Sequence, residues 1–283
     1  MLISERYLKK IGVSGTFEPD LDNLKKLLCL HIDTIPFGNI SSFLGEPISM
    51  DPDDIATKLL DAGREGYCLE HSTLTRVVLK ELGYQTRNLL GRVYYQNTPQ
   101  ATPPKTHLVT VVKLDGKDYL FDPGFGGITP TGLISFDLGD QVQSTPLESF
   151  RLVKPIDTGF HLDTLEGVEV MLQAYVRDTW INLYALNTHD FVTHSDAVLA
   201  NWYISTSPLS LFTQQLMIAR ATATERATIS GITMRIHGKT GSKTQQLQSV
   251  YDFRQAIDEI MQINTDSLDL TQVYEHVKLG RVN

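Results

Sequence analysis

Residues 106–127 have the sequence THLVTVVKLDGKDYLFDPGFGG, which predicts a β-hairpin followed by a glycine-rich turn. Asp115 and Gly116 separate two apolar runs, a pattern typical of a two-residue hairpin turn. With that turn, His107 and Asp122 point to one face of the hairpin as diagonal neighbours, about 7–8 Å apart at the backbone. A turn one residue longer would send Asp122 to the opposite face, because side chains alternate along a strand. The hairpin register therefore decides whether these two side chains can interact.

The composition of the chain excludes several classes of protein. Its 283 residues include 25 Lys and Arg against 33 Asp and Glu, which gives a formal net charge of −8. This acidic balance argues against nucleic-acid binding, since the phosphate backbone requires clustered positive charge. Apolar runs stay below the ~18 residues of a transmembrane helix, and the N-terminal segment lacks the apolar core of a signal peptide. We therefore expect a cytoplasmic protein with no nucleic-acid and no membrane partner.

The two cysteines of the chain, Cys29 and Cys68, are too few for a disulfide framework or a cysteine-rich zinc site. No HExxH motif occurs either, so we expect no bound metal. Cys29 lies in the amphipathic run LLCLH, where a small buried side chain is the ordinary role. Cys68 lies in GREGYCLEHSTL at the predicted start of a helix, where the helix dipole and unpaired N–H groups favour a thiolate. Position alone leaves Cys68 open as a nucleophile or as a buried cysteine.

The character of the sequence changes twice along the chain. Residues 1–87 are helical, residues 88–190 contain short β-type runs separated by Pro, Gly and Asp, and residues 191–283 mix both types. This order predicts an α+β fold with helices first, then a small antiparallel sheet or barrel, then a mixed region. Helices are expected over 21–33, 53–60, 68–82, 207–219 and 249–263, and strands over 227–230 and 232–237.

A thiolate nucleophile requires a nearby imidazole, and the imidazole requires an orienting carboxylate or amide. Among the eight histidines, His107 stands out because the hairpin register sets it beside the carboxyl group of Asp122. A helix-start Cys, then a strand His, then an Asp on the next strand is the general order of papain-like and transglutaminase-like thiol acyltransferases. Each residue also has an ordinary structural role, but together they predict a thiol-protease-like core of Cys68, His107 and Asp122.

Several motifs resemble those of the arylamine N-acetyltransferase family, in the order in which that family has them. They are REGYCLE (64–70), which resembles Arg-Gly-Gly-x-Cys-x-Glu; TH (106–107) and DPGFGG (122–127), which resemble the family's His and Asp motifs; IPFGN (35–39), which is similar to Pro-Phe-Glu-Asn; and SPLSLF (207–212), which resembles a third-domain motif. The matches extend from about residue 31 to residue 212, and the length of the chain also fits the family.

The resemblance implies a three-domain fold, with a helical bundle over 1–87, an antiparallel β-barrel over 88–190 and a mixed α/β lid over 191–283. It also implies a ping-pong reaction. Cys68 would take the acetyl group of acetyl-CoA and pass it to an arylamine, a hydrazine or an arylhydroxylamine. His107 would activate the thiol, and Asp122 would orient and charge the imidazole.

The resemblance further indicates where the two substrates bind. Phe125 is expected to line the acceptor pocket and set its specificity, with Phe37 second, and Thr106 is expected to contribute to substrate binding. The loop that contains Gly124, Gly126 and Gly127 is not a Walker A loop. Its glycines could still present N–H groups to a CoA phosphate or allow a ligand to approach closely. Without the resemblance, a turn after the strand is the simpler interpretation of these glycines.

Three residues depart from the family pattern: Glu65 replaces a Gly, Gly38 replaces a Glu, and Ser72 stands where Asn is common. A carboxylate at Glu65 would disfavour the thiolate if it faced Cys68. Alternatively, Glu65 supplies the acid that is missing at Gly38. That second hypothesis requires the two residues to be neighbours.

Other functions remain compatible with the sequence. Amide synthases resemble the same family, and a peptidase or a transglutaminase-like enzyme could use the same three residues. A binding protein that has lost its activity is a further alternative, although the intact Cys, His and Asp argue against it.

Overall fold

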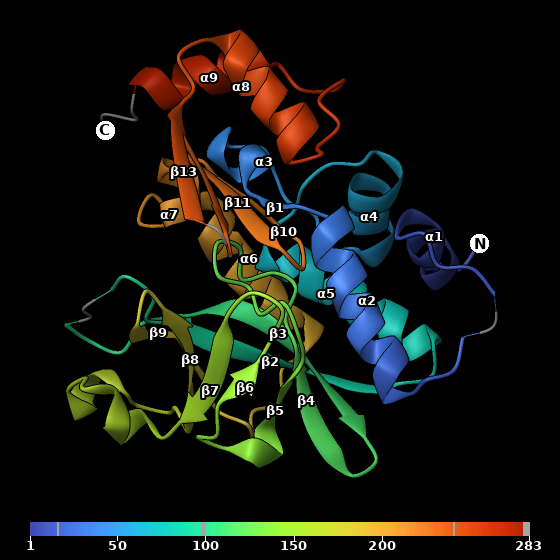
Figure 1. Ribbon diagram of the computed structural model, residues 1–283, viewed down its shortest axis with the longest axis vertical. Helices are drawn as coiled ribbons and strands as arrows, with labels where there is room; N and C mark the ends of the chain where they lie inside the picture. The colour runs from blue at the N-terminus through green and yellow to red at the C-terminus, as the bar shows by residue number, and fades with distance from the viewer. Residues whose placement is uncertain (16, 98–99, 240, 280–283) are drawn as a thin grey trace.

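The structure of the chain is a computed structural model that describes residues 1–15, 17–97, 100–239 and 241–279. N-terminal helices, a β-barrel and a C-terminal α/β layer follow one another along the chain, which confirms the predicted α+β fold (Figure 1). The predicted third unit ends on residues 280–283, which lie outside the described residues.

The N-terminal helices form where the hydrophobic periodicity predicts them. α2 (Leu21–Thr34) begins after Asp20, whose carboxylate accepts a hydrogen bond from the N–H of Asn23. α5 (Cys68–Glu81) ends before Gly83, which has a φ of +93° and so takes the left-handed conformation that glycine adopts at helix ends. The other N-terminal elements are α1 (Ile3–Lys10), β1 (Phe37–Gly38), α3 (Ile40–Phe43), α4 (Pro52–Ala56) and the π-helical turn η1 (Thr57–Asp61).

The described part of the barrel is a nearly closed antiparallel sheet of eight strands in the order β5-β4-β3-β2-β9-β8-β7-β6. The strands are β2 (Gln85–Val93), β3 (Lys105–Leu114), β4 (Lys117–Phe121), β5 (Ile134–Ser135), β6 (Gln143–Ser144), β7 (Ser149–Val153), β8 (Val170–Val176) and β9 (Thr179–Leu186), and 3₁₀ turns occupy Phe136–Leu138, Pro155–Thr158 and Leu162–Thr164. Its interior is an apolar cluster that includes Val109, Phe150 and Tyr184.

The register of the β3–β4 hairpin is the one that the sequence predicts. Leu114 pairs with Lys117, so the turn between the strands has two residues. Asp115 and Gly116 have φ angles of 51° and 77°, as expected for the tight turn that matches the twist of a hairpin. The segment after β4 therefore returns Asp122 to the face that carries His107.

The C-terminal part consists of a second antiparallel sheet and its helices. The sheet has the order β1-β10-β11-β12-β13, so its first strand comes from the N-terminal part of the chain. Its elements are α6 (His194–Thr206), α7 (Leu211–Gln214), β10 (Met217–Ala221), β11 (Glu225–Ser230), β12 (Thr233–Gly238), β13 (Gly241–Gln246), α8 (Val250–Gln255), the π-helical turn η5 (Ala256–Ile260) and α9 (Leu270–Leu279). The predicted strands over 227–230 and 232–237 and the helix over 249–263 are confirmed within ordinary boundary error.

The predicted helix over 207–219 is wrong. Ser207 follows the last residue of α6, and Ser210 caps the short helix α7 by accepting a hydrogen bond from the N–H of Phe212. The chain becomes extended at Gln215, and the following apolar residues form β10, which pairs with β1 and β11. Pairing with strands that are distant in sequence decides the conformation of this segment, and periodicity alone does not detect that pairing.

Candidate active site

Cys68 is the first residue of α5 and lies at the centre of the site. The Tyr67 N–H donates to Oε2 of Glu70 (3.0 Å), so a side chain three residues on caps the helix. Cys68 is 3% exposed, and its Sγ lies 3.6 Å from the carbonyl oxygen of Thr106 at the start of β3. The dipole of α5 therefore favours negative charge at a thiol that faces the hairpin.

His107 and Asp122 form the hydrogen bond that the hairpin register predicts. Nε2 of His107 lies 2.9 Å from Oδ2 of Asp122, and both side chains are buried. Burial lowers the pKa of His107, but the charge and the hydrogen bond of Asp122, with smaller contributions from Cys68, raise it overall to about 10. With Nε2 bound to the carboxylate, Nδ1 is the nitrogen left for the Cys68 thiol. The structure thus brings the three predicted residues together from α5, β3 and the end of β4.

Tyr184 on β9 is a member of this cluster that the sequence reasoning missed. Its hydroxyl donates to Oδ2 of Asp122 at 2.7 Å, and its ring centroid lies 4.5 Å from that of His107. Burial and the charge of Asp122 raise the pKa of Tyr184 well above its usual value, so the phenol stays protonated as a donor. The Gly124 N–H donates to the other oxygen of Asp122 at 3.1 Å. No short motif surrounds Tyr184, because the pairing of β9 with β2, rather than local sequence, sets it beside the hairpin.

The glycine-rich loop after Asp122 packs against Cys68. A Cβ on Gly124 would lie 3.0 Å from Cα of Cys68, so only glycine allows this approach. Gly126 has a φ of +84°, and a Cβ there would lie 2.9 Å from the ring of Phe37. A Cβ on Gly127 would meet nothing closer than a methyl carbon of Thr228 at 3.9 Å. The N–H of Gly124 is already engaged by Asp122, so Gly127 is the glycine of this loop with the most space beside it.

Aromatic side chains lie around Cys68 and His107. Phe37 on β1 contacts Phe212 edge to face at 5.9 Å, and Phe212 contacts Tyr67 at 5.6 Å. Phe125 is partly exposed, and its ring lies 5.0 Å from that of His107. Phe37, Tyr67 and Phe212 form one apolar cluster with Cys68 and with small residues of α6, whereas Phe125 packs against the barrel cluster. The thiol therefore faces a surface that suits a flat apolar molecule better than a charged one.

Asn39 explains why the IPFGN segment lies beside the site. Its Nδ2 donates to the carbonyl oxygens of Phe212 (2.9 Å) and Gln215 (2.8 Å), and its Oδ1 accepts from the N–H of Met217 (2.7 Å). One buried amide thus ties the N-terminal part to the segment between α7 and β10, and both of its N–H groups and its oxygen are hydrogen-bonded to backbone.

The residues that depart from the family pattern have defined positions. Gly38 and Glu65 are neighbours, and a Cβ built on Gly38 would overlap Cγ of Glu65. Glu65 is fully buried, with Oε2 3.2 Å from Nε of Arg64. The hypothesis that Glu65 supplies the acid missing at Gly38 requires the two residues to be neighbours, and they are. That Glu65 replaces the missing acid stays a prediction. Ser72 donates to the carbonyl oxygen of Leu108 at 2.6 Å and so fastens α5 to β3 beside His107.

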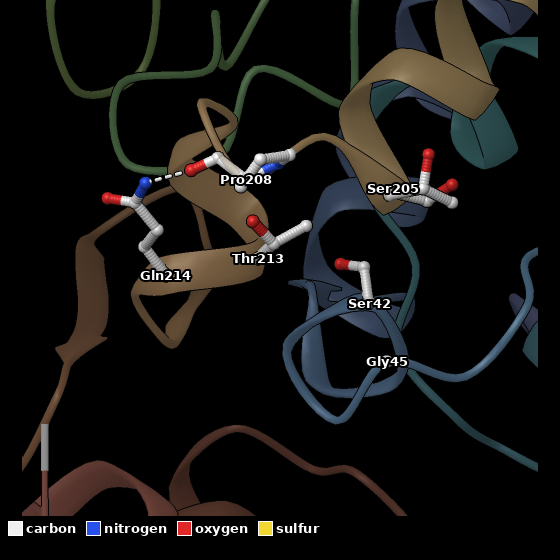
Figure 2. Close-up of a pocket in the computed structure, with 7 residues that line it drawn as sticks. Ser42, Gly45, Ser205, Pro208, Thr213 and Gln214 are labelled. Atoms are coloured by element: carbon white, nitrogen blue, oxygen red, sulfur yellow. Dashed lines mark hydrogen bonds between the residues drawn. The ribbon is translucent and has the colours of Figure 1, made fainter. Parts of the chain in front are cut away.

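A cavity of about 250 Å³ lies away from this cluster, between α3, α6 and α7 (Figure 2). None of Cys68, His107 and Asp122 lines it. Its polar side chains donate to nearby carbonyl oxygens, as Ser205 does to Asn201 (2.7 Å) and Gln214 does to Pro208. We therefore assign the chemistry to the thiol cluster and not to this cavity.

Within the described residues, no group of three or more His, Cys, Asp or Glu side chains is arranged to hold a metal ion. Likewise, none of the helices in the described ranges is long and apolar enough to cross a membrane.

The geometry matches a known class of enzyme. The family model for N-acetyltransferases matches residues 20–270. The chain is 37% identical over 262 residues to an arylamine N-acetyltransferase of Mycobacterium bovis, covering 91% of this chain and 88% of that one. It is 34% identical over 218 residues to the Escherichia coli enzyme of the same name, covering 77% of this chain and 73% of that one.

Solved structures agree with the sequence comparisons. The arylamine N-acetyltransferase of M. tuberculosis superposes with a TM-score of 0.87 at 34% identity, covering 96% of this chain and 98% of that one. The Mycobacterium marinum enzyme in complex with CoA superposes with a TM-score of 0.87 at 33% identity, covering 98% of each chain. The chain is thus an acyltransferase of the N-acetyltransferase class. More particularly, it belongs to the arylamine N-acetyltransferase family.

Proposed function

We propose that the protein transfers an acetyl group from acetyl-CoA to arylamines, hydrazines or arylhydroxylamines through an acetyl-Cys68 intermediate, in the cytoplasm. The observation that carries this proposal is the Cys68 thiol at the start of α5, beside a His107 that Asp122 and Tyr184 hold in place. Membership of the family supports the choice of donor and acceptor. The proposed domains, 1–87, 88–190 and 191–283, contribute the nucleophile, the His–Asp pair and one wall of the acceptor pocket.

The first half of the reaction acetylates the enzyme. Cys68 gives its proton to Nδ1 of His107, and the imidazolium is stabilised by the Asp122 carboxylate. The thiolate attacks the thioester carbonyl of acetyl-CoA to form a tetrahedral intermediate. The C–S bond to CoA then breaks, and the departing CoA sulfur takes the proton from His107. The products are acetyl-Cys68 and CoA.

The second half of the reaction transfers the acetyl group. The nitrogen of an arylamine is neutral at pH 7 and can attack the acetyl-Cys68 carbonyl without first losing a proton. It forms the new C–N bond, His107 takes its surplus proton, and Cys68 leaves as the thiolate. We assign Phe125 and Phe37 to the walls of the acceptor pocket, with Thr106 at its edge. The apolar rings of Phe37, which is buried, and Phe125, which is partly buried, favour a neutral aromatic acceptor over a protonated alkylamine.

The donor must bind an acidic protein although it carries negative phosphates. We assign Gly124, Gly126 and Gly127 to the donor site. Gly124 and Gly126 would act by letting the loop approach Cys68 and Phe37, because a Cβ at either position would come too close to those residues. Gly127 has open space beside it and is the residue of the three at which a phosphate or pantetheine group could approach the backbone.

Mass spectrometry after mixing with acetyl-CoA tests the proposal. We expect one acetyl group on the wild-type protein, none on Cys68→Ala, and loss of the adduct when an arylamine is added. The matched control is Cys29→Ala, which removes the other free thiol and should leave the adduct intact. An unreactive wild-type protein, or one that instead hydrolyses peptides or closes a carrier-bound acyl chain, would refute the proposal.

A further inference from the structure

A chain of hydrogen bonds between buried side chains crosses the N-terminal helices and ends at the backbone beside Cys68. The Tyr7 hydroxyl lies 3.0 Å from Nδ1 of His31, and Nε2 of His31 lies 2.7 Å from Nδ1 of His71. Nε2 of His71 lies 3.0 Å from the carbonyl oxygen of Gly66. Tyr7 is 1% exposed and both histidines are fully buried. The reaction described above uses none of these three side chains.

The acceptor at one end fixes the direction of every hydrogen bond in this chain. The Gly66 carbonyl can only accept, so His71 must carry its proton on Nε2 and accept on Nδ1. His31 then donates from Nε2 and accepts on Nδ1, which makes the Tyr7 hydroxyl the donor. Burial lowers the pKa of His71 to about 4. Burial, and then the proximity of His71, lower the pKa of His31 well below its usual value. Both rings are therefore neutral, and all four of their nitrogens take part in hydrogen bonds.

The Gly66 carbonyl that receives the last hydrogen bond joins two parts of the site. It also accepts from the N–H of Gly38 at 2.8 Å, so it fastens β1 to the turn that precedes Cys68. His71 lies one helical turn after Cys68, and its ring stacks on that of Phe37 with 6.5 Å between centroids and 12° between planes. A Cβ on Gly124 would lie 3.0 Å from Cβ of His71. His71 thus contacts Phe37 on β1 and the glycine-rich loop, and it hydrogen-bonds to the turn that precedes Cys68.

We propose that the Tyr7–His31–His71 chain positions the Cys68 thiol for acyl transfer by holding the Gly66 carbonyl in place. This inference rests on the proposed function, because it concerns the same nucleophile. Gly66 is two residues before Cys68, so rotation of its peptide group would change the direction in which α5 presents the thiol. Tyr7, His31 and His71 are positioning residues, and no proton has to move along the chain.

Tyr7, at the end of the hydrogen-bond chain farthest from Cys68, provides the sharpest test. It lies on α1, and Tyr7→Phe removes a single hydroxyl. The matched control is Tyr84→Phe. Tyr84 is 4% exposed, belongs to the same apolar cluster, and donates its hydroxyl to the carbonyl oxygen of Asp20 at 2.8 Å. Each variant loses one phenol hydrogen bond, which is buried for Tyr7 and partly buried for Tyr84, so thermal unfolding is measured for both and should shift at least as much in Tyr7→Phe.

The readout is the first-order rate of Cys68 acetylation at saturating acetyl-CoA, together with the acetyl-CoA concentration that gives half of that rate. We expect Tyr7→Phe to lower the rate about three- to tenfold at an unchanged half-saturating concentration, since the loss concerns alignment and not donor binding. Tyr84→Phe should acetylate at the wild-type rate. The split between rate and half-saturation separates positioning from a general loss of structure.

A second pair of variants tests His71 itself. His71→Leu leaves the Gly66 carbonyl without its side-chain donor, and we expect the acetylation rate to fall about ten- to a hundredfold. His71→Gln retains an N–H donor and a carbonyl acceptor, and should recover most of that rate. If His71→Leu does not fold, the Tyr7→Phe comparison still decides the question.

The possible outcomes separate the two proposals. Absence of an acetyl adduct on the wild-type protein would overturn the proposed function. A wild-type protein that is acetylated, with Tyr7→Phe and Tyr84→Phe reacting equally fast, would overturn the positioning role alone.

Discussion

Replacing Asp122 with Asn tests the electrostatic core of the site with little change in shape. The Asp122 carboxylate accepts hydrogen bonds from His107 (2.9 Å), Tyr184 (2.7 Å) and the N–H of Gly124 (3.1 Å). An amide has one acceptor oxygen and no charge, so it cannot serve all three donors. Its NH₂ group would face Nε2 of His107 and force the proton to Nδ1, the nitrogen that should receive the proton of Cys68.

The size of the effect follows from the pKa of His107. Burial alone would hold this pKa below 6.5, and Asp122 is the main cause of its rise to about 10. Losing the charge and the charged hydrogen bond of Asp122 removes most of this stabilisation of the imidazolium, on the order of several kcal/mol. A tautomer error of the same kind costs roughly 10⁴-fold in triad enzymes. We therefore expect kcat/KM of Asp122→Asn to fall about 10³- to 10⁴-fold.

Quenched-flow measurement of the acetyl adduct, with iodoacetamide alkylation of Cys68 across pH 5–9 as a second readout, would measure this loss. The matched control is Asp118→Asn on β4, the strand that ends just before Asp122; the Asp118 carboxylate pairs with the partly exposed Arg87, and its loss should leave the rate unchanged. Wild-type rates of acetylation and alkylation in Asp122→Asn would refute the role given to the carboxylate.

Three further predictions concern other parts of the site. Gly38→Ala should destabilise the protein by about 1–3 kcal/mol in urea unfolding, because the new Cβ overlaps Glu65, and Glu65→Gly in the same chain should restore most of the loss; additive effects of the two changes would contradict this. The pKa of His71 is lowered from 6.5 to about 4, so the unfolded chain binds a proton more tightly than the folded one. The free energy of unfolding should therefore fall by roughly 3 kcal/mol as the pH is lowered from 6.5 to 4. Thermal melts of His71→Gln should show a shallower loss over that range, and an equally steep one would argue against a neutral buried ring. Gly126→Ala should cost about 1–3 kcal/mol, since it combines a φ of +84° with a contact at 2.9 Å to the ring of Phe37, and an unchanged melting temperature would be the contrary result.

The candidate site was predictable from the sequence to the extent that local geometry defines it. A two-residue turn at Asp115 and Gly116 fixes the side on which Asp122 emerges, so the His107–Asp122 contact follows from strand periodicity alone. The position of Cys68 at a helix start follows from the glycines before it and the apolar spacing after it. These patterns do not predict that the start of α5 lies against the β3–β4 hairpin. Only the family resemblance predicts that contact.

The parts that escaped prediction depend on contacts between distant segments. α6 was missed because it has no clean apolar stripe: Ile204 and Ala200 are buried, but Leu199 and Trp202 are about two-thirds exposed. Tyr184 reaches Asp122 only because β9 pairs with β2 across the barrel. The histidines on α2 and α5 resemble ordinary core residues in sequence, and only the packing of the two helices makes them neighbours.

The pairing of β1 with β10 has a consequence for the order in which parts of the protein can fold. Asn39 accepts a hydrogen bond from the N–H of Met217, a residue 178 positions later in the chain. A ribosome must therefore synthesise most of the polypeptide before the strand that carries Phe37 acquires its neighbour. Contacts of such long sequence separation form late and slowly. Cys68, the proposed nucleophile, should consequently stay without the proposed acceptor pocket, and the enzyme inactive, until translation has passed β10.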